Sequence, residues 1–349
     1  MASTIVGIDI GSTSVRAVEV VGADRAKPVI TRYHEVALPD GSVRRGEVVH
    51  VAAVAAALRS LWSTGGFSGK DVALGMGGQR VFSRDLTVPR APLAQIRESL
   101  PFHAQELLPV PVSEAILDFY PISEELSDDG PMIKGLLIAA IKDAVTANVD
   151  AVTQAGLRPV HVDLIPFALT RALAPLGRDR DVTVLLGVGA DTTNVVITRA
   201  GVPQLVRIIS AGGDDITRAL STGLQLDAVE AEALKRTLGL GSVAPSPQNR
   251  HAFEIIYGVV GELLTGIRTT LDYYSSTKRA DAIDRIVVSG GGAQLGGFAL
   301  ALEERTGLPV VQAHPLAGAE LSRTVRERST PEQRDAMCTA FGLALGTAA

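Results

Sequence analysis

Residues 7–14 hold the side chains best suited to binding a ligand, in the order Gly-Ile-Asp-Ile-Gly-Ser-Thr-Ser. Gly11 lets a ligand approach the main chain, and the amides and hydroxyls after it can point into one concavity that suits a phosphate. Asp9 would repel a phosphate directly, but its carboxylate can hold a hydrated divalent cation beside one. An ordinary Gly-Ser hairpin without a ligand is the alternative interpretation of this stretch.

Two later stretches have related features. Residues 187–194 read Gly-Val-Gly-Ala-Asp-Thr-Thr-Asn after an apolar run, and superposing residues 9–11 on residues 187–189 places a similar hairpin at the head of each half. An internal duplication is the simplest explanation. Residues 290–292 are three successive glycines, which leave bare backbone for a flat or phosphorylated ligand; a turn that only packs a helix is the alternative.

Strands and helices must position these turns. Apolar residues before Asp9 and alternating ones after Ser14 predict two strands joined by the first turn, because alternation at period two is typical of a half-buried strand. Further strands are predicted at residues 29–38, 71–76, 116–122, 133–141, 159–164, 182–188, 195–199, 204–210 and 286–288. Helices are predicted at about residues 47–63, 93–107, 143–155, 166–174, 212–220, 253–276, 295–305 and 331–345.

Some helix ends carry their own signals. Asp143 and Asp227 are predicted N-caps, and the helix after Asp227 carries Glu232 and Lys235. Pro101 must start or kink the helix in which it lies. The helix opened by residues 212–215 is expected to have free amides at its N-terminus, available to an anion.

The segment from about residue 91 to residue 163 differs in composition from its flanks. Its helix-strand-strand-helix-strand order predicts a small α+β insertion in the first half. The acidic run at residues 124–129 is interpreted as a solvated hairpin loop, and residues 245–247 (Pro-Ser-Pro) are predicted to form a loop before a long helix.

Composition narrows the function classes. The 349 residues predict two domains, or one with a sizeable insertion. No apolar run approaches the roughly 20 residues that span a bilayer, and the N-terminus lacks a signal-peptide pattern, so a cytoplasmic protein is expected. Cys338 is the only cysteine, which excludes internal disulfides and Cys-rich metal sites. The net charge of −5 without a basic block argues against a nucleic-acid partner, and the six histidines lack metal-ligand spacing.

Two phosphate-type hairpins and a glycine turn late in the second half resemble the actin-like ATPase superfamily, which includes sugar kinases, chaperone ATPases, actin and the division protein FtsA. The resemblance implies an α/β, duplicated ribonuclease H-like fold of two domains that binds ATP or ADP with Mg²⁺ between the hairpins, the cation held by Asp9 through water. The nucleotide-binding residues that it implies are Gly11, Ser12, Thr13, Ser14, Gly189, Ala190, Asp191, Thr192, Thr193, Gly212, Gly213, Asp214, Glu232, Lys235, Gly290, Gly291, Gly292 and Gln294.

Within the superfamily, the insertion lies in the first half as it does in FtsA. Residues 88–89 (Val-Pro), 106–109 (Glu-Leu-Leu-Pro) and 139–142 (Ala-Ala-Ile-Lys) are similar to the PilM family of type IV pilus assembly proteins, and the resemblance covers the whole chain. The domains expected on this basis are a first actin-like subdomain (1–83 and 164–180), an FtsA-like insertion (84–163), a second actin-like half (181–330) and a C-terminal helix packed on the first half (331–349).

The PilM resemblance implies a cytoplasmic ATP-binding adaptor at the inner face of the cytoplasmic membrane. Its implied partner is the cytoplasmic N-terminal peptide of a PilN-like inner-membrane protein, bound in a nucleotide-linked manner between the first subdomain and the insertion, together with other pilus assembly components. Association with the membrane is expected only through this partner.

One departure from the superfamily pattern concerns hydrolysis. The aspartate that normally opens the second loop is replaced by Gly187, so slow hydrolysis or none is expected, because phosphoryl transfer depends on positioning. Asp191 is either a substitute carboxylate or a cap of its turn. The alternative functions are an active ATPase or sugar-type kinase, which needs an acidic base in the cleft, and an FtsA-like filament former, which usually has a C-terminal amphipathic membrane helix.

Overall fold

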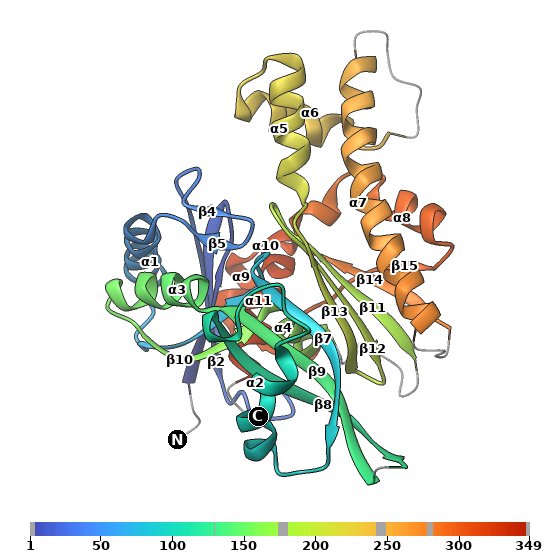
Figure 1. Ribbon diagram of the computed structural model, residues 1–349. Helices are drawn as coiled ribbons and strands as arrows, with labels where there is room; N and C mark the ends of the chain where they lie inside the picture. Colours follow the sequence, from blue (N-terminus) through green and yellow to red (C-terminus); the bar gives the residue numbers. More distant parts are fainter. Residues whose placement is uncertain (1–3, 129, 174–180, 242–248, 278–281, 347–349) are drawn as a thin grey trace.

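Two open sheets form the centre of the molecule, and a third, smaller sheet lies against them (Figure 1). The computed structural model describes residues 4–128, 130–173, 181–241, 249–277 and 282–346. The predicted loop at residues 245–247 and the last residue of the helix predicted at 166–174 lie outside these ranges. Within them, no helix is both long and apolar enough to cross a bilayer.

The first lobe is built on a six-stranded sheet of order β10-β6-β1-β2-β3-β16. Its strands are β1 (Thr4–Ile10), β2 (Ser14–Val21), β3 (Val29–Ala37), β6 (Asp71–Met76), β10 (Arg158–Leu164) and β16 (Glu320–Leu321). Helices α1 (Val51–Gly65) and α3 (Lys142–Gln154) share a buried core with one face, and α4 (Ile165–Leu173) and α11 (Cys338–Leu345) pack on the other. Gly7 permits this second contact, because a Cβ there would lie 1.9 Å from the Ala340 carbonyl oxygen.

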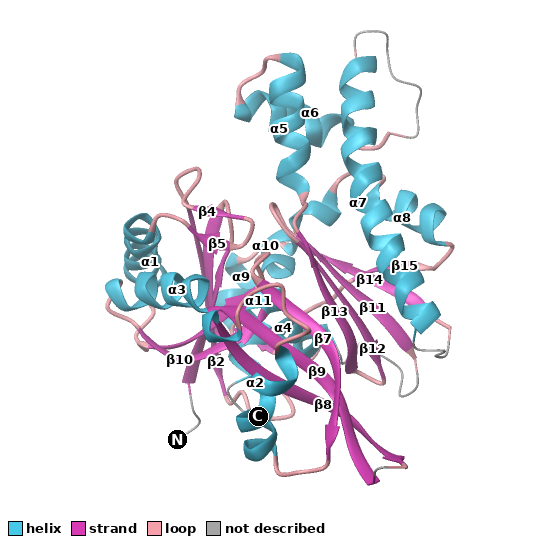
Figure 2. Cartoon of the chain, in the orientation of Figure 1, coloured by secondary structure: helices cyan, strands magenta, loops and turns pink. Residues whose placement is uncertain are grey.

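The second lobe is built on a five-stranded sheet of order β13-β12-β11-β14-β15. Its strands are β11 (Val182–Val188), β12 (Thr193–Arg199), β13 (Val202–Ile209), β14 (Arg285–Ser289) and β15 (Val310–Gln312). Its helices are α5 (Gly213–Leu224), α6 (Ala228–Leu238), α7 (Arg250–Thr277) and α8 (Phe298–Thr306), with the 3₁₀ helix η3 (Gly291–Gln294). One buried cluster joins α7 to the strands through Ile256, Val260 and Ile267, and Figure 2 shows α7 and α8 along the outer side of this sheet.

The two large sheets confirm the predicted duplication. Their first five strands follow one order, β10-β6-β1-β2-β3 matching β15-β14-β11-β12-β13, with the same parallel and antiparallel pairs. The hairpins share their register, since Asp9 pairs with Arg16 as Gly187 pairs with Asn194. The turns close alike: the Gly11 amide donates to Ser14 O over 3.0 Å, and the Gly189 amide to Thr192 O over 2.9 Å.

The third sheet, of order β7-β9-β8, is the body of the insertion. Its elements are β7 (Val81–Pro89), α2 (Leu93–Ala104), the 3₁₀ helix η1 (Val112–Glu114), β8 (Ala115–Ser127) and β9 (Gly130–Ile141). Ile96 and Leu100 of α2 fill one face, and Leu136 and Ile138 on the other face join a core shared with α4 and β13. Tyr120 stacks on Phe167 of α4 with ring centroids 4.8 Å apart. The insertion therefore bears on both lobes.

Several predicted elements differ from those observed. The helix expected from residue 47 begins at Val51, because β5 (Glu47–Val48) pairs with β4 (Val43–Arg44). Helix α2 ends at Ala104 with Pro101 inside it, and Ile141 rather than Asp143 is the N-cap of α3. Residues 124–127 of the acidic run are not a loop, since β8 continues to Ser127.

The C-terminal region and the sheet edge also differ. The helix expected over residues 331–345 is divided at Met337 into α10 (Pro331–Ala336) and α11, preceded by α9 (Arg323–Arg328). Strand β10, expected within the insertion, pairs in parallel with β6 in the first lobe's sheet. The division of the chain into domains stays a prediction. The pairing of β10 with β6 places residues 158–163, expected in the insertion, in the sheet of the first lobe.

Candidate functional site

A cavity of about 830 Å³ lies between the two lobes, and the tips of both hairpins line it. This size falls within the range of small-molecule sites. The predicted site residues on its wall are Asp9, Gly11, Ser12, Thr13, Gly189, Ala190, Asp191, Thr192, Gly213, Asp214, Glu232, Lys235, Gly290, Gly291, Gly292 and Gln294. The fold thus brings together residues from positions 9 to 294.

Three predicted residues lie behind this wall and hold the loops in place. The hydroxyl of Ser14 donates to Glu35 Oε1 over 2.6 Å, and that of Thr193 donates to the Ala211 carbonyl over 2.8 Å. The Gly212 amide donates to Asp215 Oδ2 over 2.8 Å. The structure does not bring these three side chains or amides to the cavity.

The N-terminus of α5 does not offer free amides, contrary to the sequence prediction. The Gly213 amide donates to Gly189 O over 2.9 Å, and the Asp214 amide donates to Ala190 O over 2.8 Å. The sequence gives no signal for these bonds, because the accepting carbonyls belong to the second hairpin, and β12 and β13 separate them from α5 along the chain. The helix start therefore supports the second turn from behind.

Asp9 lies in the cavity wall with an arginine that the sequence analysis did not single out. Strand pairing places Arg16 opposite Asp9, and Arg16 Nη1 lies 3.4 Å from Asp9 Oδ2, while its Nη2 lies 3.0 Å from Glu35 Oε1. Burial raises the pKa of Asp9, and the neighbouring guanidinium opposes this shift. The alternation of the hairpin was a usable signal, because Asp9 and Arg16 are cross-strand partners on one face.

The second hairpin has neutral residues at the matching positions. Gly187 takes the place of Asp9, and a Cβ at this position would lie 2.7 Å from Leu169 Cδ1, so the space for a side chain is filled by α4. Asn194 takes the place of Arg16. Among the described residues, Asn194 Oδ1 and Ser12 Oγ are buried without a hydrogen-bond partner, and both residues line the cavity. Such atoms are costly to leave unpaired, so they favour a polar ligand here.

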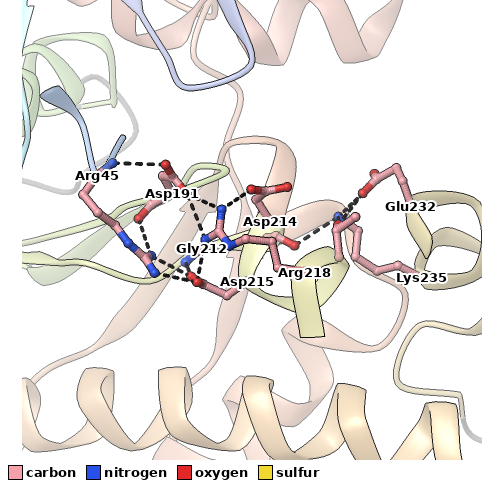
Figure 3. A network of polar contacts seen from close by, with 10 residues as sticks. Arg45, Asp191, Gly212, Asp214, Asp215, Arg218, Glu232 and Lys235 are labelled. Atoms are coloured by element: carbon pink, nitrogen blue, oxygen red, sulfur yellow. Dashed lines mark hydrogen bonds and ion pairs between the residues drawn. The ribbon is translucent and has the colours of Figure 1, made fainter. Parts of the chain in front are cut away.

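Asp191 is held from two sides and has no free carboxylate oxygen (Figure 3). Its Oδ2 accepts from the Arg45 amide over 3.0 Å, and its Oδ1 accepts from Nη1 and Nη2 of Arg218, each over 3.1 Å. Of the two roles considered for Asp191, the structure supports the one that fixes its turn. Arg45 and Arg218 were not predicted, because each meets Asp191 only in the folded chain.

Glu232 and Lys235 form a polar group on the cavity face of α6. Asp227 caps this helix as predicted, in a reciprocal pair with Glu230. Lys235 Nζ donates to Gly213 O over 3.1 Å and to Thr217 Oγ1 over 2.9 Å, and it lies 2.5 Å from Glu232 Oε2. Burial alone would raise the pKa of Glu232, but bonds from Lys235, Thr217 and Arg236 lower it to about 2.

The three glycines have different roles in the turn after β14. Gly290 adopts a φ of 91°, and a Cβ there would lie 2.4 Å from Val188 O. A Cβ on Gly292 would lie 2.9 Å from Gly189 O. Close packing on the second hairpin therefore explains these two. Gly291 lines the cavity with no atom within 4 Å of its Cβ position, so it leaves backbone open to a ligand.

Comparison with protein families gives one match over almost the whole chain. A family model described as "Type IV pilus assembly protein PilM" matches residues 7–348. Among curated proteins, the cell division protein FtsA of Bacillus subtilis (strain 168) is 22% identical over 256 residues, which cover 67% of this chain and 58% of FtsA. The matched region thus spans less than two thirds of that relative.

Solved structures show the same architecture. The PilM-PilN type IV pilus biogenesis complex contains a chain that is 27% identical, with a TM-score of 0.84 over 100% of this chain and 98% of that one. The ethanolamine utilization protein EutJ from Carboxydothermus hydrogenoformans is 16% identical, with a TM-score of 0.57 over 99% and 90%. MreB 5 of Spiroplasma citri bound to AMPPNP is 11% identical, with a TM-score of 0.54 over 91% and 94%. These likenesses confirm the predicted actin-like fold.

Proposed function

The chain belongs to the PilM family of type IV pilus assembly proteins, and from this premise we propose that it is an ATP-binding adaptor of the pilus assembly machinery. It binds Mg²⁺-ATP between its lobes and holds the cytoplasmic N-terminal segment of a PilN-like inner-membrane protein. The partner recruits it to the inner face of the cytoplasmic membrane. The PilM structure with the 0.84 TM-score comes from a complex with PilN, which supports the choice of partner.

The observation that carries the nucleotide proposal is the pair of matched turns facing one cavity. Backbone amides and hydroxyls of residues 12–13 and 190–192 would hold the phosphates, while the amides of Gly11 and Gly189 close their turns. The glycine turn, with Glu232 and Lys235, would hold the nucleoside. The unpartnered Ser12 Oγ and Asn194 Oδ1 fit a polar ligand of this kind.

A divalent cation is part of this proposal because the cavity is acidic. Its described lining includes the carboxylates of Asp9, Asp191, Asp214, Glu232, Glu332 and Asp335, against the cations of Arg16, Lys235 and Arg236. A triphosphate would meet net negative charge there, so it needs a counter-ion. Asp9, whose carboxylate contacts Arg16 at 3.4 Å, is the carboxylate that would hold the hydrated Mg²⁺.

We propose that this nucleotide is hydrolysed slowly or not at all. Leu169 fills the space beside Gly187, and Asp191 has both oxygens engaged. Neither position supplies a carboxylate that could orient an attacking water, and phosphoryl transfer depends on such positioning.

The partner peptide is proposed to bind between the first subdomain and the insertion. The three-stranded sheet packs on the rest of the molecule partly through Leu136, Ile138 and Tyr120, and the resemblance to the PilM family places the peptide at its border with the first lobe. Because the insertion bears on both lobes, a shift between the lobes would reach this border. This arrangement supports a link between nucleotide and partner.

Calorimetry tests the nucleotide part of the proposal. ATP is titrated into the full chain with Mg²⁺ and again with EDTA, and we expect binding that is at least tenfold tighter with Mg²⁺. Absence of binding in both titrations would reject the nucleotide proposal. Phosphate release at a rate above roughly 1 s⁻¹, typical of enzymes, would instead identify an active ATPase.

A further inference from the structure

Arg45, in the turn of the β4–β5 hairpin of the first lobe, contacts the second lobe (Figure 3). Its guanidinium donates to both oxygens of Asp215, over 2.9 and 2.7 Å, and to the Asp191 carbonyl over 3.2 Å. Its backbone amide donates to the Asp191 carboxylate over 3.0 Å. A guanidinium and a carboxylate joined by two parallel bonds form a strong and directional pair.

The hairpin that carries Arg45 is fixed firmly in the first lobe. Arg45 O accepts from the Gln79 amide over 3.3 Å, and Glu47 pairs with Arg80 over 2.7 Å. The next residue, Gly46, packs so closely that a Cβ there would lie 2.7 Å from Gly78 Cα. The contact of Arg45 with the second lobe therefore depends on the position of the whole first lobe and not only on that of a single loop.

Arg45 itself has a φ of 51°, in the left-handed region that side chains other than glycine seldom adopt. The two-residue turn between β4 and β5 explains this conformation, because its two central residues, Arg45 and Gly46, both take a positive φ. Here the conformation turns the backbone amide and the guanidinium toward the same pair of aspartates. A glycine would adopt this backbone more easily but would have no guanidinium.

On the second lobe, the aspartates that receive Arg45 also organise the second turn. Asp191 lies at its tip and is 6% exposed. Asp215 accepts from the Gly212 amide over 2.8 Å and from Arg218 over 2.7 Å. Burial raises the pKa of Asp215, but bonds from Arg45, Gly212 and Arg218 outweigh this effect and lower it. The turn and the start of α5 are thus joined in one network, with a cation supplied by the other lobe.

We infer that Arg45 is a positioning residue for the second phosphate turn: it sets the turn around Asp191 and the first turn of α5 from across the cavity, and so ties this half of the site to the closed arrangement of the lobes. The inference rests on the proposed function in taking the ligand to be a nucleotide. When the lobes separate, the second turn loses this support, and the nucleotide is released. Arg45 and Asp215 side chains are 32% and 20% exposed, so salt screens part of the contact.

Release of a fluorescent ATP analogue measures the effect on the ligand. The full chain is loaded with the analogue and Mg²⁺, and its dissociation is followed after excess unlabelled ATP is added. Arg45→Ala is expected to release the analogue about tenfold faster, the change expected for one charge-assisted bidentate contact. Arg45→Lys keeps the positive charge but cannot form two parallel bonds to one carboxylate, so its dissociation rate should lie between those of the wild type and Arg45→Ala. Arg44→Ala, in the same hairpin beside Gly41, is the matched control and should match the wild type.

Hydrogen exchange of the nucleotide-free chain provides a readout that does not depend on the ligand. The amides of Gly213 and Asp214 bond to carbonyls of the second turn, so they report its order. Arg45→Ala should speed their exchange about tenfold, and Arg44→Ala should leave it unchanged. Equal exchange in Arg45→Ala and the wild type would overturn the inference, whether or not the chain binds ATP.

A double-mutant cycle separates positioning from a general loss of stability. Arg45→Ala and Asp215→Asn each remove one partner, so the double variant should exchange and release ligand no faster than the more affected single variant. Independent, multiplied effects would show that the two residues act separately and would contradict the inference. Analogue release within twofold of wild type in Arg45→Ala, with normal binding, would reject it while leaving the nucleotide proposal intact.

Discussion

Adding a carboxylate at position 187 tests whether Leu169 fills the space that a side chain would occupy there. In Gly187→Asp, the new Cβ lies 2.7 Å from Leu169 Cδ1, far inside the ordinary contact distance of about 3.5–4.0 Å. Leu169 is 3% exposed and packed in the cavity wall, so its side chain has to shift to make room. Overpacking of this kind costs about 1–3 kcal/mol, so we expect Gly187→Asp to lower the free energy of unfolding by about 2 kcal/mol.

Leu169→Ala removes the obstructing side chain. Alone it should cost about 2 kcal/mol, the low end for a buried leucine, because Leu169 borders the cavity. Independent effects would add to about 4 kcal/mol in the double variant. Relief of the clash predicts about 2 kcal/mol instead, a coupling of roughly 2 kcal/mol.

Urea unfolding followed by circular dichroism measures all three variants. Leu173→Ala, a buried leucine on the same helix, is the control, and its cost should add to that of Gly187→Asp within about 0.5 kcal/mol. Additive costs for Gly187→Asp and Leu169→Ala would refute the argument that Leu169 fills the place of this side chain. Phosphate release by the double variant should exceed that of the wild type. The double variant has a carboxylate at position 187, which matches Asp9 of the first hairpin, and this carboxylate can orient an attacking water.

Three further predictions concern single residues. Asp9→Asn should weaken ATP binding with Mg²⁺ at least tenfold and leave binding in EDTA within twofold, as measured by calorimetry; equal losses in both would show that Asp9 does not act through the cation. The pKa of Glu232, about 2 in the fold against an ordinary 4.5, makes its contribution to stability complete above pH 4.5 and lost as the pH falls toward 2, so the difference in unfolding free energy between wild type and Glu232→Gln should shrink between pH 6 and pH 3. Burial raises the thiol pKa of Cys338 to about 12, so an aromatic disulfide reagent at pH 8 should modify the native chain at less than about a hundredth of the rate of the unfolded chain; comparable rates would contradict the burial.

The elements around the two hairpins could be predicted because their signals are local. Apolar runs marked β1 and β11, alternation at period two marked β2, and the duplication placed both turns in equivalent positions. The cap at Asp227 marked the start of α6 in the same way. These features depend on neighbours in the sequence, so the sequence contains them.

Other elements give no local signal. Strands β4 and β5 have two residues each, too short for any period, so residues 47–48 were assigned to the helix that follows. Residues 124–127 of the acidic run continue β8 because they pair with β9, not because of their composition. The division at Met337 has no glycine or proline to mark it, and Met337 is fully buried.

The turns of the candidate site could be predicted from the sequence, but most contacts between residues far apart in the chain could not. Residues 9–13 and 189–192 could be chosen from glycines and hydroxyls. The contact of Arg45 with Asp191 joins positions 146 residues apart and exists only when the lobes meet. Likewise, Leu169 restricts Gly187 only through the packing of α4 on β11. Arg16 is the exception, because its pairing with Asp9 follows from the hairpin itself.

The most direct test of the account is a titration of the cytoplasmic N-terminal peptide of a PilN-like partner into the full chain, with and without Mg²⁺-ATP. If nucleotide and partner favour the same arrangement of the lobes, the peptide should bind at least tenfold more tightly with Mg²⁺-ATP, and the peptide should tighten ATP binding by the same factor. Equal peptide affinity in the two titrations would contradict the account.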